Sequence, residues 1–349
     1  MSRFGEGVRE LYSGYFALVM ATGIVSIASF RLGYELVAYA LLVINVAAYL
    51  VLWVLAIARA VLHPRRFAAD LTSHGTGPGF FTVVAGTAVL GSQVLLLTGM
   101  RPVAEALWWL ATVLWVLIIY TFFTAITVRE TKPTIDEGLS GAWLIAVVAT
   151  QSVPVLGGLL ALSDPSPHPV RLFFLLAMYL LGGMLYLLII NLIVYRFAFF
   201  TLPPETLTPP YWINMGAVAI TTLAGSTLVL LAPKLALLTS LKPFVAGLTL
   251  FFWATATWWI PLLFLLGAWR HLVRKVPLRY HPAYWGMVFP LGMYTACTLQ
   301  LSQAIEVPFL VYVSEGFVFL ALAAWLASFV GLVHGLTRLG RTVTPAPRS

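Results

Sequence analysis

Ten stretches of this sequence are each long and apolar enough to cross a lipid bilayer, and this feature constrains the fold more than any other. A spanning helix needs about 20 mainly apolar residues. The stretches are 12–31, 34–62, 77–99, 103–128, 139–163, 170–199, 209–232, 240–270, 282–304 and 308–336. We therefore predict an all-α integral membrane protein with ten transmembrane helices in one domain over residues 1–336. Residues 337–349 are expected to form a short basic cytoplasmic tail.

The charged residues support this prediction and give an orientation. Only 9% of the residues are charged, whereas a soluble domain has about a quarter. Of the 20 Lys and Arg residues, 15 lie at the two ends or in loops on one side, and 5 lie on the other side. Cytoplasmic loops of membrane proteins are enriched in Lys and Arg. We expect both termini in the cytoplasm, a location in the plasma (inner) membrane, and no nucleic-acid partner despite the net charge of +8.

The segments alternate in character along the chain. The five odd-numbered segments hold 14 glycines and most of the hydroxyl and amide residues, whereas the five even-numbered ones hold 7 glycines and are apolar nearly all round. Uniformly apolar helices can face lipid, while small and polar residues belong inside a bundle. The alternation predicts five helical hairpins, with an inner ring of odd-numbered helices around a central pore and an outer ring of even-numbered helices.

Each odd-numbered segment places small, polar or aromatic residues on one helical face, at 100° per residue. Such a stripe can line a water-filled path or allow close helix packing, and its recurrence in five segments favours the path. Pro154 and Pro290 would add kinks that free backbone carbonyls. The residues predicted to line the pore are Tyr15, Thr22, Ser26, Phe80, Thr87, Gly91, Thr150, Pro154, Gly157, Asn214, Thr221, Gly225, Phe289, Pro290, Gly292, Ala296 and Gln300.

Charged residues are missing from the interiors of the odd-numbered segments. A proton relay or cation path usually contains a carboxylate or histidine within the membrane. Hydroxyls, amides and helix ends suit a weakly held anion better. Glu315 lies in the tenth, even-numbered segment and keeps a proton-coupled transporter as an alternative.

Signals of catalysis or metal binding are absent from the sequence. The six histidines lie in loops or at segment ends without metal-ligand spacing, and no nucleotide-binding motif occurs. Cys297 lies off the predicted pore stripe and is expected to pack in the core. We expect no catalytic residues, no metal and no cofactor. A membrane-embedded enzyme that binds headgroups through the basic loop 270–282 is a remote alternative.

Three segments carry a family resemblance that extends over essentially the whole chain. FALVMATGIVS (16–26), PPYWINMGAVAITTLAG (209–225) and YWGMVFPLGMYTA (284–296) resemble the first, seventh and ninth helices of the tellurite-resistance/dicarboxylate transporter family. Ala21 replaces a glycine that is common there. This family includes plant slow-type anion channels and fungal malate permeases. The resemblance implies five hairpins around a pore, a homotrimer, and a gating phenylalanine before a proline, which corresponds to Phe289.

We therefore expect a channel or passive transporter for small anions such as chloride, nitrate or a C4 dicarboxylate like malate, with Phe289 as its gate. A phenyl ring in a narrow lumen is an apolar barrier to a hydrated anion. The alternatives are a proton-coupled dicarboxylate symporter and a tellurite-resistance exporter.

Overall fold

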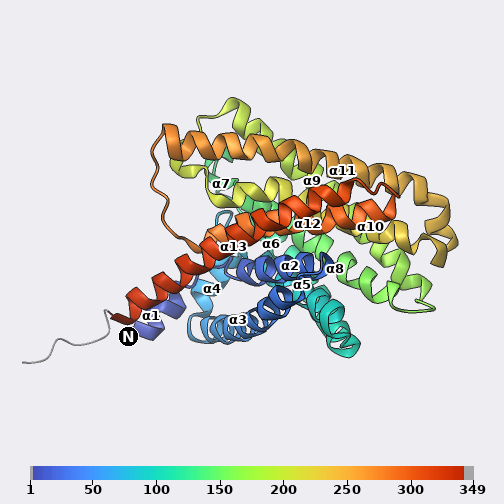
Figure 1. Cartoon of the computed structure of the whole chain (residues 1–349). Coiled ribbons are helices and arrows are strands. Elements are labelled where there is room, and N and C mark those ends of the chain that lie inside the picture. The colour runs from blue at the N-terminus through green and yellow to red at the C-terminus, as the bar shows by residue number, and fades with distance from the viewer. Residues whose placement is uncertain (1–2, 342–349) are drawn as a thin grey trace, which may run out of the picture.

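The computed structural model describes residues 3–341, and no β-strand occurs in that range (Figure 1). Ten helices in it have 15 or more residues. They are α2 (Ala17–Arg31), α3 (Glu35–Leu62), α5 (Phe81–Thr98), α6 (Arg101–Val128), α8 (Ile145–Leu162), α9 (Pro169–Phe199), α10 (Ile213–Leu231), α11 (Ala236–Ala268), α12 (Trp285–Ala304) and α13 (Leu310–Arg341). Shorter helices are α1 (Arg3–Arg9), α4 (Pro64–Leu71) and α7 (Ile135–Gly138).

The long helices coincide with the ten predicted segments. The largest difference is at the fifth segment, which was expected from residue 139, whereas α8 begins at Ile145. A 3₁₀ turn, η2 (Gly141–Leu144), precedes α8, and similar turns precede α5, α10 and α12 as η1 (Gly77–Phe80), η4 (Pro209–Trp212) and η7 (Pro282–Tyr284). At the other end of the chain, α13 continues to Arg341, so residues 337–341 of the expected tail are helical. The rest of that tail, 342–349, lies outside the described residues.

Eight helices in residues 3–341 are long and apolar enough to cross a membrane. The other two long helices are α2 and α12. α2 has only 15 residues, and α12 interrupts its apolar side chains with proline, glycine, threonine and glutamine. The fold is therefore that of an all-α, multi-pass membrane protein.

Burial divides the long helices into two sets. Between 83% and 94% of the most apolar 18-residue window is buried in α5, α8 and α10, against 22–44% in α3, α6, α9, α11 and α13. Almost every residue of α2 and α12 is also buried. The buried set contains the segments rich in glycine and hydroxyl residues, because small side chains allow helices to approach one another closely.

The five buried helices contact one another in a closed circuit. The contacts run from α2 to α5, α8, α10 and α12, and from α12 back to α2. Each buried helix also packs against the exposed helix that follows it in the chain. The first and last parts of the chain consequently lie side by side, with α13 beside both α12 and α2 (Figure 1).

Each of the five exposed helices forms a hydrogen bond of the same type to the buried helix of the next pair. In every case an aromatic side chain on the exposed helix bonds to a hydroxyl or a carbonyl on the buried one. The pairs are Tyr49–Thr87 (3.0 Å), Trp115–Thr150 (2.9 Å), Tyr186–Asn214 backbone oxygen (3.3 Å), Trp253–Thr298 (2.9 Å) and Trp325–Thr22 (3.0 Å). The same type of link therefore recurs around the whole circuit, including the junction between the two ends of the chain.

Candidate functional site

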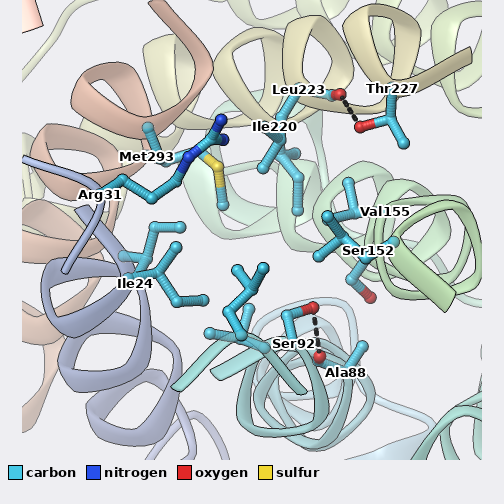
Figure 2. A pocket seen from close by; sticks show the side chains of 15 residues that line it. Ile24, Arg31, Ala88, Ser92, Ser152, Val155, Ile220, Leu223, Thr227 and Met293 are labelled. Carbon is cyan, nitrogen blue, oxygen red and sulfur yellow. Dashed lines mark hydrogen bonds between the residues drawn. The ribbon is translucent and has the colours of Figure 1, made fainter. Parts of the chain in front are cut away.

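A cavity lies between the five buried helices, lined by residues from their middle turns onward, and we call it the Arg31 cavity (Figure 2). The space open to a water-sized sphere is about 20 Å³, which is room for about one water molecule. Most of its wall is aliphatic. The lining residues are Ile24, Ile27, Arg31, Ala88, Val89, Ser92, Leu96, Ser152, Val155, Leu159, Ile220, Leu223, Thr227, Met293 and Ala296.

The polar wall residues of the Arg31 cavity direct their hydrogens into their own helices. Ser92 donates to the Ala88 carbonyl (2.9 Å) and Thr227 to the Leu223 carbonyl (2.8 Å), as Figure 2 shows. Ser152 donates in the same way to the Ala149 carbonyl (2.7 Å). These hydroxyls therefore present mainly oxygen lone pairs, and the donors on the cavity wall come chiefly from the guanidinium of Arg31.

Arg31 is held in place by two amides of α12. Its Nη1 donates to Gln300 Oε1, and its Nη2 donates to Gln303 Oε1 at 2.8 Å. No carboxylate pairs with Arg31 in residues 3–341, whereas two other arginines at the same end of the bundle are neutralised. Arg101 pairs with Asp164 (3.1 Å) and Arg171 with Glu105 (2.9 Å). Arg31 therefore brings a positive charge with neutral partners to the edge of the cavity.

A second cavity lies between the first turns of the same five helices, and we call it the Phe289 cavity. Its space open to a water-sized sphere is about 10 Å³, slightly less than one water molecule needs. None of the described residues that line it is charged. They are Tyr12, Gly14, Ala17, Met20, Thr82, Ile145, Pro210, Ile213, Ala283, Gly286 and Phe289.

Phe289 lies at the boundary between the two cavities. Its side chain is fully buried and lines the Phe289 cavity. Met293, one helical turn further along α12, lines the Arg31 cavity. Four residues of α-helix span about 6 Å, so the turn from Phe289 to Met293 separates two spaces that are lined by the same five helices.

The order of these cavities shows that the five buried helices run in parallel. Each contributes early residues to the Phe289 cavity and later residues to the Arg31 cavity. A helix carries partial positive charge at its N-terminus and partial negative charge at its C-terminus. No acidic residue occupies the first turn of α2, α5, α8, α10 or α12. The Phe289 cavity is therefore surrounded by five positive helix ends.

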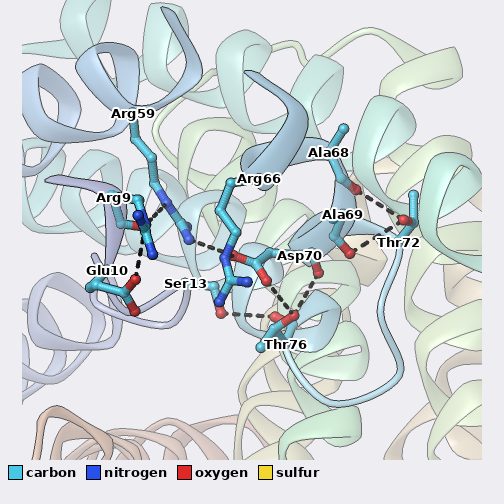
Figure 3. A network of polar contacts seen from close by, with 10 residues as sticks. All are labelled: Arg9, Glu10, Ser13, Arg59, Arg66, Ala68, Ala69, Asp70, Thr72 and Thr76. Carbon is cyan, nitrogen blue, oxygen red and sulfur yellow. Dashed lines mark hydrogen bonds and ion pairs between the residues drawn. The ribbon is translucent and has the colours of Figure 1, made fainter. Parts of the chain in front are cut away.

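A buried ionic network fixes the chain segment that enters α2 (Figure 3). Asp70 on α4 pairs with Arg59 of α3 and with Arg66 at 3.3 Å. Thr76 donates its hydroxyl to the Asp70 carbonyl (2.8 Å), and Ser13 donates its hydroxyl to the Thr76 carbonyl (2.8 Å). Because Ser13 lies between Tyr12 and Gly14, the network positions two residues that line the Phe289 cavity.

Three of the threonines predicted to line the pore face exposed helices. Thr22, Thr87 and Thr150 form the hydrogen bonds to Trp325, Tyr49 and Trp115 described above. Ser26 donates to the Ala38 carbonyl of α3 at 2.7 Å. Helical phase identified hydroxyl residues that are buried, but these hydroxyls point away from the two cavities. They form hydrogen bonds to side-chain donors and backbone carbonyls of the exposed helices.

The predicted glycines are sites of close packing. A Cβ added to Gly91 would lie 2.5 Å from a Leu156 methyl carbon, and one added to Gly157 would lie 2.7 Å from Trp108 Nε1. An added Cβ on Gly225 would overlap the Thr249 hydroxyl of α11, and one on Gly292 would lie 2.9 Å from Ile24 Cγ2. These glycines therefore bring helices together and do not line either cavity.

Some of the remaining predicted residues line or adjoin the cavities, and others do not. Phe289 and Ala296 line the cavities, and Gln300 holds Arg31. Tyr15 and Phe80 line an apolar groove between α3 and α6 instead. Pro154, Asn214, Thr221 and Pro290 are buried within their helices without lining either cavity; Thr221 bonds to the Ala217 carbonyl (2.7 Å), and Pro290 packs on Gly216.

Several cavity residues were missed by the sequence analysis, and Arg31 is the most informative of them. It was counted with the loop because it is the last residue of its segment. Its spacing from Ile24 and Ile27 places all three on one helical face, which is a signal that the sequence did contain. Glu315, the acidic residue considered for proton coupling, is exposed on α13 and lines neither cavity.

Comparisons with known proteins agree with a transport function. The sequence profile of the family described as SLAC1, voltage-dependent anion channel, matches residues 10–333. Sulfite efflux pump SSU1 of Trichophyton rubrum is 25% identical over an alignment of 345 residues, which covers 94% of this chain and 91% of the pump. An uncharacterised transporter of Methanocaldococcus jannaschii is 22% identical over an alignment of 338 residues, which covers 94% of this chain and 95% of that transporter.

A further relative is an uncharacterised membrane protein of Mycobacterium tuberculosis, which is 42% identical over 160 residues, 45% of this chain and 80% of that protein. The resemblance to the tellurite-resistance/dicarboxylate transporter family is thereby confirmed, since the SLAC1 profile describes the same family. Because that profile covers nearly the whole chain, this protein belongs to the SLAC1 family of anion channels and transporters and is not an enzyme.

Proposed function

We propose that the protein is a passive pathway for small anions, running along the centre of the five buried helices. In this proposal the protein lies in the plasma (inner) membrane. All ten long helices cross it as five hairpins, and both termini lie in the cytoplasm. The Phe289 cavity then faces the cytoplasm and the Arg31 cavity faces outward. The observation that carries the proposal is that both cavities are lined by residues of all five buried helices.

The electrostatics of the two cavities favour an anion over a cation. Five helix N-termini without acidic residues surround the Phe289 cavity. Among residues 3–341, the only charged residue that lines the Arg31 cavity is the arginine itself. In the part of the chain that the structure describes, no carboxylate or histidine lines either cavity. A proton-coupled symporter therefore lacks a carboxylate or histidine on the proposed path, and Glu315 is exposed on α13.

Phe289 acts as the gate in this proposal. Its ring is buried at the boundary of the cavities, where the open space is too small for a hydrated ion. A change of side-chain rotamer would connect the two cavities without a movement of the helices. Gly14, Ala17 and Gly286 line the Phe289 cavity and have little or no side chain.

The cargo we propose is a small inorganic anion such as chloride, nitrate or sulfite, with a C4 dicarboxylate such as malate as the alternative. The narrow cavities and the name of the sulfite efflux pump among the relatives favour the inorganic group. A tellurite-resistance phenotype would be compatible with anion export. A homotrimer, implied by the family resemblance, is retained as part of the proposal.

The proposal is tested by anion flux into proteoliposomes that contain the purified full-length chain. Phe289→Ala should raise nitrate flux by about tenfold or more, because tenfold corresponds to only about 1.4 kcal/mol of barrier. Phe252→Ala is the matched control, since Phe252 is equally buried but lies on α11 away from both cavities. Equal flux in wild type and Phe289→Ala at equal protein content would remove Phe289 as the gate.

A further inference from the structure

We propose that Arg31 forms a binding site for one singly charged anion at the C-terminal end of the pathway, and that this site discriminates against doubly charged anions. The proposal rests on the proposed function, because it assigns a substrate class to the same pathway. It concerns a different cavity from the gate, so the two can fail separately.

The guanidinium retains donors for a ligand. Arginine has five N–H donors, and the bonds to Gln300 and Gln303 use two of them. The other three form no hydrogen bond within residues 3–341. Arg31 is only half-buried and faces the cavity between Ile24 and Met293 (Figure 2). Because Gln300 and Gln303 are neutral, they orient the guanidinium without cancelling its charge.

The helix ends explain why a positive charge is required at this position. All five buried helices end on this side, and their C-termini carry partial negative charge that repels anions. The Lys234 ammonium binds the Ala161 carbonyl (3.0 Å) and the Leu162 carbonyl (3.2 Å) at the end of α8. Arg31 occupies the last turn of α2 and is the cation that reaches the cavity wall. Without it, an anion leaving the Phe289 cavity would enter a region of negative potential.

The described residues of the cavity wall supply no second positive charge. The three hydroxyls of Ser92, Ser152 and Thr227 already donate to backbone carbonyls, and the other lining residues are apolar. A single negative charge is therefore matched by Arg31, whereas a second one would be dehydrated in the cavity without a positive partner. The ligand class is a small monoanion such as chloride, nitrate or hydrogen sulfite, in preference to sulfate or the malate dianion.

Binding can be measured without any flux. The purified full-length chain in detergent is heated in nitrate and in sulfate at equal ionic strength, and the midpoint of thermal unfolding is compared. A ligand that binds the folded state raises this midpoint. We expect nitrate to raise it in the wild type and in Arg31→Lys, but not in Arg31→Gln. Equal stabilisation of the wild type and Arg31→Gln by nitrate would overturn the proposal.

Selectivity is measured in proteoliposomes that contain the Phe289→Ala protein. Adding Arg31→Gln should lower nitrate flux by about tenfold and reduce the ratio of nitrate to sulfate permeability by about the same factor, because one partly dehydrated charge has been removed. Arg31→Lys should keep most of the ratio. Arg101→Gln is the matched control, since Arg101 lies at the same end of the bundle, pairs with Asp164 and lines neither cavity.

An unchanged permeability ratio in Arg31→Gln, or an equal change in Arg101→Gln, would overturn the inference. If Phe289→Ala fails to raise the flux while nitrate still stabilises the wild type and not Arg31→Gln, the gate is wrong and the Arg31 site stands. If the flux rises but neither assay responds to Arg31→Gln, the pathway stands and the site is wrong.

Discussion

Trp325 on the last helix donates a hydrogen bond from its indole Nε1 to the hydroxyl of Thr22 on α2, with a nitrogen–oxygen distance of 3.0 Å. The two residues are separated by 303 positions in the sequence, and both are buried. Their bond joins the two ends of the closed circuit of helices. Four equivalent bonds join the other neighbouring pairs.

Removing this bond should destabilise the protein moderately. Trp325→Phe keeps an aromatic ring but loses the indole donor, so we expect a decrease of about 0.5–1.5 kcal/mol in the free energy of unfolding. The measurement is reversible unfolding in mixed micelles, as a double-mutant cycle with Thr22→Val. Trp109→Phe is the control, because Trp109 is largely exposed. Strictly additive effects of the two substitutions would show that the bond contributes nothing.

A larger side chain at position 286 should narrow the proposed pathway in the Phe289→Ala protein. A Cβ added to Gly286 would meet its nearest atom, Ile213 Cδ1, at 3.7 Å, which is an ordinary contact. Phe289→Ala vacates the space of the phenyl ring, and in that protein Gly286→Leu should place its side chain in the Phe289 cavity. In the Phe289→Ala protein it should reduce nitrate flux by about tenfold, since tenfold corresponds to about 1.4 kcal/mol of barrier. Gly286→Ala, as the control, should change the flux little. Undiminished flux with leucine would mean that ions bypass this cavity.

The Asp70 network should be important for stability. Asp70→Asn removes the charge that faces the buried Arg59, and breaking a buried ion pair costs about 3–5 kcal/mol. We expect a large loss in the free energy of unfolding in mixed micelles. Glu10→Gln is the comparison, because the Arg9–Glu10 pair has side chains that are 52% and 60% exposed, and such pairs contribute about 0–1 kcal/mol. Similar effects of the two substitutions would contradict the structural role of the network.

His281 should make stability dependent on pH. Its Nδ1 accepts a hydrogen bond from the Ala283 N–H (3.1 Å), and burial lowers the pKa of His281 below its usual value. The unfolded chain then binds a proton at a higher pH than the folded chain. This contribution to stability is present in full above the unfolded pKa of about 6.5 and is lost as the pH falls through the folded pKa.

The test for His281 is the difference in the unfolding midpoint between pH 7.5 and pH 5.0. His281→Asn keeps a side-chain acceptor for the Ala283 N–H but cannot be protonated, as asparagine is a good N-cap residue. The difference should therefore be smaller in His281→Asn than in the wild type. An identical pH dependence in both proteins would exclude His281 as its source.

The sequence by itself determined where the helices lie and which of them are buried. Length and hydropathy located all ten long helices, because a bilayer sets a minimum length for an apolar helix. The start of α8 was placed too early because residues 141–144 are apolar but form a 3₁₀ turn, capped by the hydroxyl of Ser140. Glycine and hydroxyl content separated buried from exposed helices, since these residues permit close packing.

Only the tertiary structure decided which face of each buried helix meets which neighbour. A helix in the centre of the bundle packs against other buried helices on one side and exposed helices on the other, and both sides favour small and hydroxyl residues. Helical phase therefore identified Thr22, Thr87 and Thr150 as residues of the polar faces of their helices. It did not show which neighbouring helix each face contacts. Their partners, Trp325, Tyr49 and Trp115, come from other helices. The same reason applies to Arg31, because in the sequence a cation at the end of a segment cannot be distinguished from a loop residue. In the structure, Gln300 and Gln303, about 270 positions away, hold Arg31 beside the cavity.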